Sequence, residues 1–138
     1  MIVLDTNVLS ALMRKDREPA VLRWLDGQPP ESIWLSSVTV FEVQFGIGLL
    51  ARGKRQQALT IAFEQLLHDD FEGRVADFDT AAADAAAGIA VKRERAGRPV
   101  DVRDTWIAGI VVSRQAALAT RNTRHFEDLD LALVNPWS

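Results

Sequence analysis

Three acidic residues adjoin apolar sequence in ways that point to chemistry, and Asp5 is the first. Asp5 directly follows the apolar run Ile2–Leu4. Such runs are typical of strands in parallel sheets that helices cover on both faces. Ligands of these sheets bind beyond the carboxyl ends of the strands, which makes Asp5 a candidate site residue. The alternative is an N-cap, in which the Asp5 side chain accepts from the free N–H groups of a helix.

Glu42 is the second acid, and it lies within a pattern of apolar residues at helical spacing. The members of this stripe are Val38, Phe41, Phe45 and Leu49. A stripe of this kind is expected to face the core, and a buried carboxylate needs a partner or becomes neutral through a raised pKa. The alternative is a capping box, because Thr39 and Glu42 have the spacing of that motif.

Asp104 is the third acid and stands at the head of another apolar stripe. Ile107, Ala108 and Val111 follow it at three, four and seven positions. If Asp101 caps this helix, Asp104 is turned inward. The alternative is an acid placed near a helix N-terminus because the helix dipole favours it there.

Four further polar residues follow predicted strands. Asn122 has an amide oxygen and is a candidate fourth ligand, although a turn would also favour asparagine. Thr6 and Ser37 carry hydroxyls that would serve either a site or a helix cap. Arg121 either contacts an RNA phosphate or remains solvated.

The residue types favour a hard metal ion if the acids converge. Several carboxylates at one sheet edge repel one another unless a cation binds them, and oxygen ligands suit Mg²⁺ or Mn²⁺. Such an ion activates water and stabilises a phosphoryl displacement. The two histidines, His68 and His125, do not have the spacing of a metal site.

Strands alternating with helices would have to position these residues. Strands are expected at 2–4, 32–36, 74–78, 117–120 and 131–134. Helices are expected at 6–13, from 19 to the break at 27, at 38–50, 56–67, about 80–96 and 101–115. This alternation predicts an α/β fold with a parallel sheet and right-handed crossovers.

Length and composition fit one domain over residues 1–138. Hydrophobic residues make up 48% of the chain and charged residues 25%, typical of a globular protein. The formal net charge of −3 means that any nucleic acid contact needs a local basic patch. The chain has no cysteine, which excludes disulfides and fits a reducing compartment. With no signal peptide or membrane-spanning run in view, we expect a cytoplasmic protein.

Taken in order, these segments resemble the PIN-domain nucleases of the VapC toxin type, particularly their FitB-like branch. The resemblance covers essentially the whole chain and rests on Ile2–Asn7, Leu35–Glu42, Asp104–Ala108, Ala119–Asn122 and Asn135–Trp137. Each segment alone is a loose pattern, but their order and separations are specific.

The resemblance implies a function and an assembly. Asp5, Glu42 and Asp104 would be the catalytic acids and metal ligands of a Mg²⁺- or Mn²⁺-dependent endoribonuclease, the toxin of a type II toxin–antitoxin pair. It also implies a PIN-like three-layer sandwich, with a mostly parallel sheet and helices on both faces. A homodimer, a small DNA-binding antitoxin and a higher assembly with that antitoxin are the implied partners. Much of the family has a fourth acid where this chain has Asn122, which leaves the fourth ligand open.

Two surface features bear on RNA and on the antitoxin. Lys92, Arg93 and Arg95 would either contact an RNA backbone or form a solvated helix end, and we expect the solvated helix end. Leu12, Met13 and Trp24 are more apolar than two short surface helices need, and the resemblance places an antitoxin segment over this region.

Other classes fit the sequence less well. A phosphatase of the dehalogenase type needs a second Asp where this chain has Asn7, and no glycine loop has the context of a nucleotide-binding fold. One alternative stays open: a catalytically weak PIN scaffold that acts as a binding module with a DNA-binding antitoxin. Asn122 supports that alternative.

Overall fold

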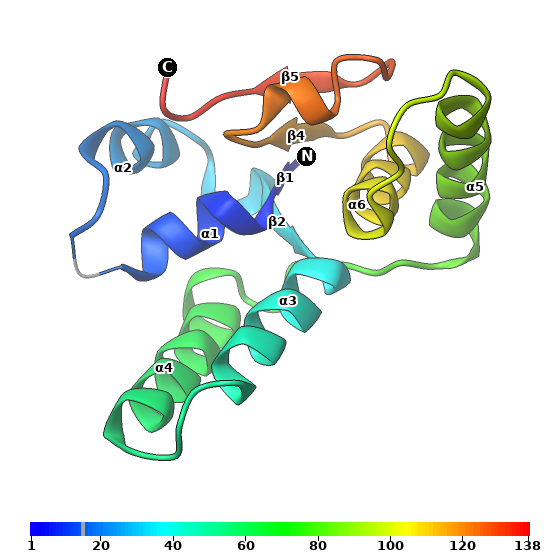
Figure 1. The fold of residues 1–138 in the computed structure, drawn as a ribbon. Coiled ribbons are helices and arrows are strands. Elements are labelled where there is room, and N and C mark those ends of the chain that lie inside the picture. Colours follow the sequence, from blue (N-terminus) through cyan, green and yellow to red (C-terminus); the bar gives the residue numbers. More distant parts are fainter. Residues whose placement is uncertain (15) are drawn as a thin grey trace.

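Five short strands form the central sheet in the computed structural model, which describes residues 1–14 and 16–138 (Figure 1). The strands are β1 (Ile2–Leu4), β2 (Ile33–Ser36), β3 (Val75–Ala76), β4 (Ala117–Ala119) and β5 (Ala132–Val134). Their order is β3-β2-β1-β4-β5, and every neighbouring pair is parallel. The predicted α/β class and parallel sheet are therefore confirmed, with β1 at the centre.

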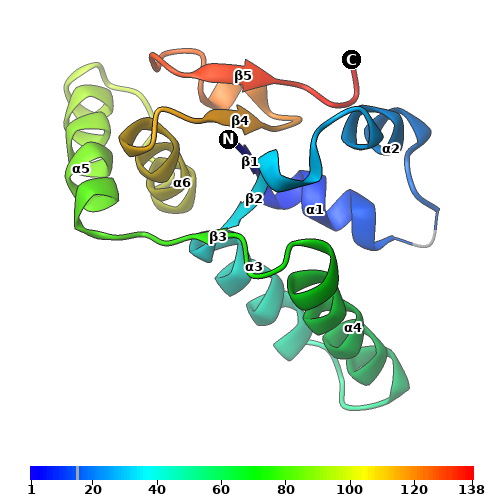
Figure 2. The same ribbon diagram turned by 180° about the vertical axis from the view of Figure 1, so that it is seen from behind.

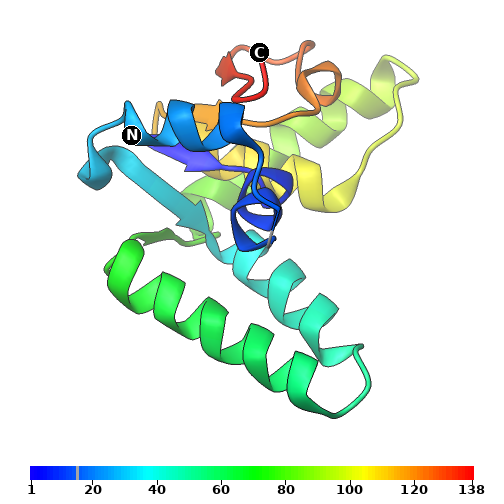
Figure 3. The same ribbon diagram turned by 90° about the vertical axis from the view of Figure 1, so that its left-hand side faces the viewer.

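Six α-helices surround this sheet within the described part of the chain. They are α1 (Thr6–Met13), α2 (Pro19–Asp26), α3 (Ser37–Gly48), α4 (Lys54–Gln65), α5 (Thr80–Arg95) and α6 (Val102–Ser113). Helices α1 and α2 lie on one side of the sheet, and α5 and α6 on the other (Figures 1 and 2). Helices α3 and α4 form a hairpin that projects from the sheet (Figure 3). The three-layer arrangement matches the expected PIN-like sandwich.

The core consists of two apolar clusters, one on each face of the sheet. Successive side chains of a strand point to opposite faces, so Val3 joins one cluster and Leu4 the other. Both residues are completely buried. This two-sided burial explains why the first strand is apolar throughout and why the first polar residue, Asp5, comes only where the strand ends.

Acidic and hydroxyl side chains fix the starts of four helices. Asp5, Ser36, Asp79 and Asp101 are the N-caps of α1, α3, α5 and α6, and each accepts a backbone N–H. Ser36, rather than Thr39, caps α3, so the capping-box alternative for Glu42 is wrong. Asp101 caps α6 as expected, which leaves Asp104 in the first turn.

The expectation that the α3 stripe faces the core is wrong beyond its first member. Val38 is buried, but Phe41, Phe45 and Leu49 are 50%, 45% and 74% exposed. The reason is that α3 leaves the sheet after its first turn and projects away from it (Figure 3). This exposed surface, Phe41, Phe45 and Leu49, is called the α3 stripe below.

Helices α5 and α6 approach each other closely, and this contact sets the position of Asp104. A Cβ atom added to Gly109 would lie 2.5 Å from the Ala82 carbonyl oxygen and 2.7 Å from the Ala86 Cβ. Glycine on α6 and alanines on α5 are therefore needed at this crossing.

Candidate active site

Asp5 is both an N-cap and the most buried acid at the carboxyl end of the sheet. The residue is 5% exposed. Oδ1 accepts from the Thr6 N–H at 2.8 Å, and Oδ2 accepts from the Thr120 hydroxyl at 2.8 Å. Burial raises the pKa of Asp5, the two hydrogen bonds oppose that rise, and the negative charge of Asp104 adds to it. The cap and site interpretations are therefore compatible.

Glu42 is joined to the end of β1 through a hydroxyl. The Thr6 Oγ1 donates to Glu42 Oε1 at 2.9 Å and lies 2.9 Å from the Thr39 hydroxyl oxygen. The other carboxylate oxygen, Oε2, lies 3.7 Å from Nη1 of Arg103. The Glu42 side chain is 22% exposed, so it borders solvent at the edge of the site.

Asp104 reaches the same region from α6. Its Oδ2 lies 3.1 Å from Nδ1 of His125, and its side chain is 23% exposed. Burial raises the pKa of Asp104, and the negative charges of Asp101 and Glu42 raise it further, while His125 opposes them. The acid thus sits in an unfavourable field of like charge.

The three predicted acids therefore lie at the same end of the sheet: Asp5 directly follows β1, Glu42 is on α3 and Asp104 is on α6. The charge of Asp104 acts on Asp5, and the charge of Glu42 acts on Asp104. An open cavity of about 370 Å³ is lined by Glu42, Asp101–Arg103 and Asp104. Among the described residues, no three acidic or histidine side chains are grouped closely enough to hold a metal ion by themselves. The acids form an open, negatively charged site rather than a closed cage.

The other predicted residues differ in how they relate to the acids. The Asn122 backbone N–H donates to the Thr120 hydroxyl at 3.0 Å, and Thr120 in turn donates to Asp5. The Asn122 residue is exposed, and its amide group has no hydrogen-bond partner in the described structure. The predicted role of Asn122 as a ligand thus stays a prediction.

Ser37 and Arg121 lie away from the acid contacts. The Ser37 hydroxyl accepts from the Phe78 N–H at 2.9 Å and fixes the segment after β3. Arg121 is exposed, its backbone N–H donates to the Asn7 side chain at 3.3 Å, and its guanidinium lies 4.9 Å from the centre of the Trp137 ring. Thr6 is the predicted hydroxyl that does contact an acid of the site.

Sequence reasoning missed Arg93, whose side chain is 4% exposed rather than solvated as expected. Its Nε and Nη2 each donate to Asp128 at 3.1 Å, and Nη2 also donates to the His125 carbonyl oxygen. These hydrogen bonds lower the pKa of Asp128. A signal was present, because the buried face of α5 consists of Ala82, Ala86, Ile89 and Arg93, which recur at helical spacing.

Comparison with known proteins is consistent with this arrangement. The pattern of the PIN domain matches residues 2–131 of the chain. The chain belongs to the PIN-domain family. Two relatives are each 36% identical over 137 residues: the VapC ribonuclease Y4jK of Sinorhizobium fredii and the toxin FitB of Neisseria gonorrhoeae. Both alignments cover 99% of this chain, with 98% of Y4jK and 99% of FitB.

A solved structure has the same PIN-domain fold. The structure of FitAB bound to the IR36 DNA fragment contains a chain with a TM-score of 0.91 and 36% identity. The match covers 100% of this chain and 96% of that one. In the described residues of this PIN-domain protein, no helix has the length and apolar character needed to cross a membrane.

Proposed function

We propose that this PIN-domain protein is the toxin of a type II toxin–antitoxin pair and cleaves RNA as a Mg²⁺- or Mn²⁺-dependent endonuclease. The observation that carries the proposal is the placement of Asp5, Glu42 and Asp104 at the carboxyl end of the sheet, with Thr6, the neighbour of Asp5, donating to Glu42. The names of the two relatives, a VapC ribonuclease and a toxin, support it.

The donor set suits a hard divalent cation. Burial and like charge raise the pKa of Asp5 and Asp104, so a nearby cation would favour their charged forms. Mg²⁺ usually binds through one or two carboxylates, with waters and phosphate oxygens completing its shell. Asp5 and Asp104 would hold the ion, with Glu42 beside it, which agrees with an open site. The bound ion supplies charge for the phosphoryl group and lowers the pKa of a water molecule.

The remaining side chains orient the acids. The Thr120 hydroxyl donates to Asp5 Oδ2 and the Thr6 N–H donates to Asp5 Oδ1, so the carboxylate cannot rotate freely. The Thr6 hydroxyl fixes Glu42, which would orient the attacking water. Hydrogen bonds of this kind, one shell beyond the reacting groups, support both metal affinity and activity.

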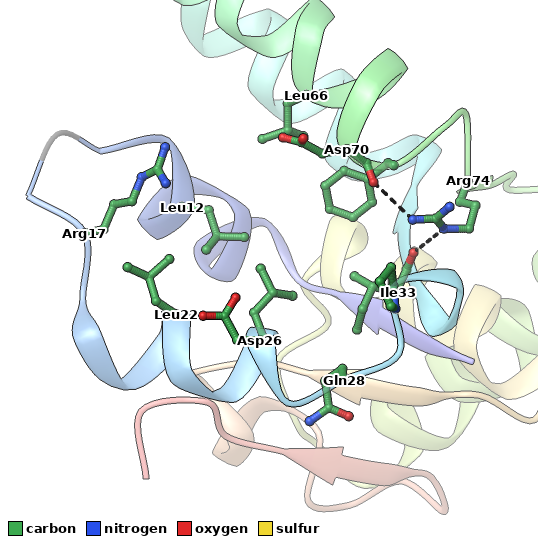
Figure 4. Close-up of a pocket in the computed structure, with 12 residues that line it drawn as sticks. Leu12, Arg17, Leu22, Asp26, Gln28, Ile33, Leu66, Asp70 and Arg74 are labelled. Carbon is green, nitrogen blue, oxygen red and sulfur yellow. Dashed lines mark hydrogen bonds between the residues drawn. The ribbon is translucent and has the colours of Figure 1, made fainter.

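A partner site is proposed at a separate cavity between α1, α2 and the π-helix Leu66–Asp70. A cavity of about 380 Å³ lies there (Figure 4). Leu12, Leu22 and Leu25 supply apolar walls, and Arg17 and Asp26 stand at the same cavity. Of the residues expected under an antitoxin, Leu12 is buried and Met13 and Trp24 are half-buried. An amphipathic antitoxin segment would place an apolar side chain in this cavity.

Cleavage of a mixed pool of single-stranded RNA tests the catalytic proposal. Wild type should cut with Mg²⁺ or Mn²⁺ and stop in EDTA. Asp104→Asn, which removes charge but keeps shape, should lose at least about 100-fold, as when one electrostatic stabiliser of a transition state is removed. Full activity of Asp104→Asn, or of wild type in EDTA, would contradict the mechanism. Inactive wild type that still binds an antitoxin would support the binding-module alternative.

Growth tests the toxin assignment separately. Strong expression of this chain should inhibit growth, and co-expression with a small DNA-binding protein encoded beside it should relieve inhibition and yield a complex. Leu22→Glu should weaken that complex by placing a charge in the apolar cavity. A harmless chain that forms no complex would overturn the assignment.

A further inference from the structure

A second cavity also borders Asp104 but not Glu42, and nothing so far gives it a role. It measures about 270 Å³, and its lining residues are Arg93, Arg98, Pro99, Asp101, Asp104, Arg124 and His125. We propose that this cavity binds the phosphate and ribose of the nucleotide next to the cleaved bond. The inference rests on the proposed function and specifies where its RNA substrate lies.

Two arginines in the lining differ in their acidic partners: Arg98 shares Asp128 with Arg93, and Arg124 has no partner among the described residues. Arg124 is exposed, and no described acid lies within ion-pair distance of it. Arg98 lies 3.5 Å from Asp128, but both oxygens of Asp128 already accept from Arg93. The Arg98 side chain is 46% exposed, so it can reach a ligand. Guanidinium groups suit phosphate because they donate through a planar fork.

The acids in the lining already have donors. Asp101 Oδ1 accepts the Asp104 N–H at 3.0 Å, and Asp104 Oδ2 lies 3.1 Å from His125 Nδ1. The repulsion of an incoming phosphate by these acids is therefore smaller than their number suggests.

The wall of the cavity is held in place before any ligand binds. Arg93 connects α5 to Asp128 and to the His125 carbonyl oxygen, and its Nη1 lies 3.5 Å from the Thr105 hydroxyl. The buried guanidinium thus braces the segment Thr123–His125 against α6. A preformed site binds with a smaller loss of conformational entropy.

The size of the cavity limits what it holds. A volume of about 270 Å³ falls just below the roughly 300–1,000 Å³ of small-ligand pockets. This is room for one ribose phosphate and not for a run of nucleotides. The cavity borders Asp104, so the bound unit is a neighbour of the phosphate that the activated water would attack.

Salt-dependent binding of single-stranded RNA in EDTA tests the subsite. Removing one phosphate contact should make the negative slope of log K against log salt shallower by about 0.7. It should also weaken binding about fivefold at 0.1 M salt. Arg98→Gln and Arg124→Gln should each show this loss. Arg98→Lys should largely restore the slope, because the charge is retained.

Arg95→Gln is the matched control. Arg95 is on the last turn of α5, is exposed, and lines a different surface hollow. Arg95→Gln removes the same charge without reaching the cavity. The slope of log K against log salt should therefore stay at its wild-type value. Losses that are equal for Arg95, Arg98 and Arg124 would mean that only general charge attraction is at work, and would overturn the inference.

A neutral methylphosphonate placed at each RNA position in turn locates the contact. At one position beside the cleaved bond, wild type should bind the substituted RNA about fivefold more weakly, which is the loss expected from one phosphate contact. Arg124→Gln should show no additional loss at that position, because the pair would already be broken. Additive losses at every position would reject the subsite. Wild type that cleaves RNA while these variants behave normally would leave the proposed function intact and remove the subsite alone.

Discussion

Asp5 shows how one residue serves structure and chemistry together. Its backbone ends β1 and its Oδ1 caps α1, so the local geometry that starts the helix also fixes the carboxylate. A helix N-terminus attracts negative charge, which offsets part of the penalty of burying this acid. The remaining penalty is visible as the raised pKa of Asp5.

Without metal, replacing this acid should stabilise the fold. Because the pKa of Asp5 is raised in the native state, that state binds the proton more readily, and stability falls as pH rises through the window between the unfolded and folded pKa values. Asp5→Asn keeps a capping side chain and should raise the Tm in EDTA at pH 7. The gain should disappear below the unfolded pKa, where Asp5 is protonated in both states.

Asp128→Asn should lower the Tm at pH 7 and serves as the contrast to Asp5→Asn. Arg93 lowers the pKa of Asp128, so this carboxylate stabilises the fold above its unfolded pKa, and that contribution is lost as pH falls through the folded pKa. Thermal melts from pH 3 to pH 8 check both variants. A lower Tm for Asp5→Asn at pH 7 in EDTA would contradict the electrostatic account of the site.

Asn122→Asp tests whether position 122 belongs to the metal site. A carboxylate attracts a hard cation more strongly than an amide oxygen. The variant should therefore bind Mn²⁺ more tightly and need less Mn²⁺ for half-maximal cleavage. Calorimetric titration of both proteins decides the matter, and equal affinities would remove Asn122 from the site. In that case its contact with Thr120 would serve only the turn.

At the scale of elements, the crossing of α5 and α6 sets where Asp104 stands. Gly109→Ala places a Cβ atom against the Ala82 carbonyl oxygen and the Ala86 Cβ. Overpacking of this kind should destabilise the protein by about 1–3 kcal/mol. Denaturant unfolding measures the change, and cleavage should fall as well because α6 carries Asp104.

Gly88→Ala is the matched control for that variant. Gly88 is exposed within α5, and a Cβ atom there would meet no neighbour. Helix propensity then favours alanine by roughly 0.8–1 kcal/mol. The two substitutions are chemically identical, so opposite signs would locate the effect in the helix crossing. Equal effects would contradict it.

Local patterns predicted most elements because their determinants are local. The apolar run before Asp5, the cap at Asp101 and the break at Gly27 each mark a boundary that the structure reproduces. The three acids were also found from local patterns: Asp5 follows an apolar run, and Glu42 and Asp104 lie in apolar stripes at helical spacing. The burial of individual side chains was not predicted as well, because it depends on which element, distant in sequence, packs over them.

Two residues show this limit in opposite directions. Phe45 was expected in the core and is 45% exposed, because α3 projects from the sheet. Arg93 was expected in solvent and is buried, because Asp128, 35 residues later, supplies its counter-charge. Sequence spacing predicted which residues share a face of each helix, but not which element packs against that face.

For the whole molecule, the parallel sheet is what unites acids from distant parts of the chain. Residues 5, 42 and 104 follow or face the carboxyl ends of adjacent strands, because β1 pairs with both β2 and β4. Antiparallel neighbours would carry their ends to opposite edges. The site is therefore a consequence of topology.

The exposed α3 stripe leads to the last prediction, that two copies of this chain associate through it. Phe41 and Phe45 lie 5.8 Å apart between ring centres, and the Arg103 guanidinium lies 5.1 Å and 5.7 Å from those centres. Exposed apolar patches of this kind mark interfaces, and aromatic residues with arginine are enriched in their cores. A second copy is the occupant that the family resemblance implies.

Wild type should be a dimer and Phe45→Glu a monomer, as measured by light scattering across a concentration series. Val91→Glu is the control, since Val91 is 47% exposed on α5, far along the chain from the stripe. A dimer that survives Phe45→Glu would reject the α3 interface. Arg103 connects the stripe to Glu42 at 3.7 Å, so loss of the partner should also disturb the acid site. A monomer with undiminished cleavage would show instead that each chain carries a complete site.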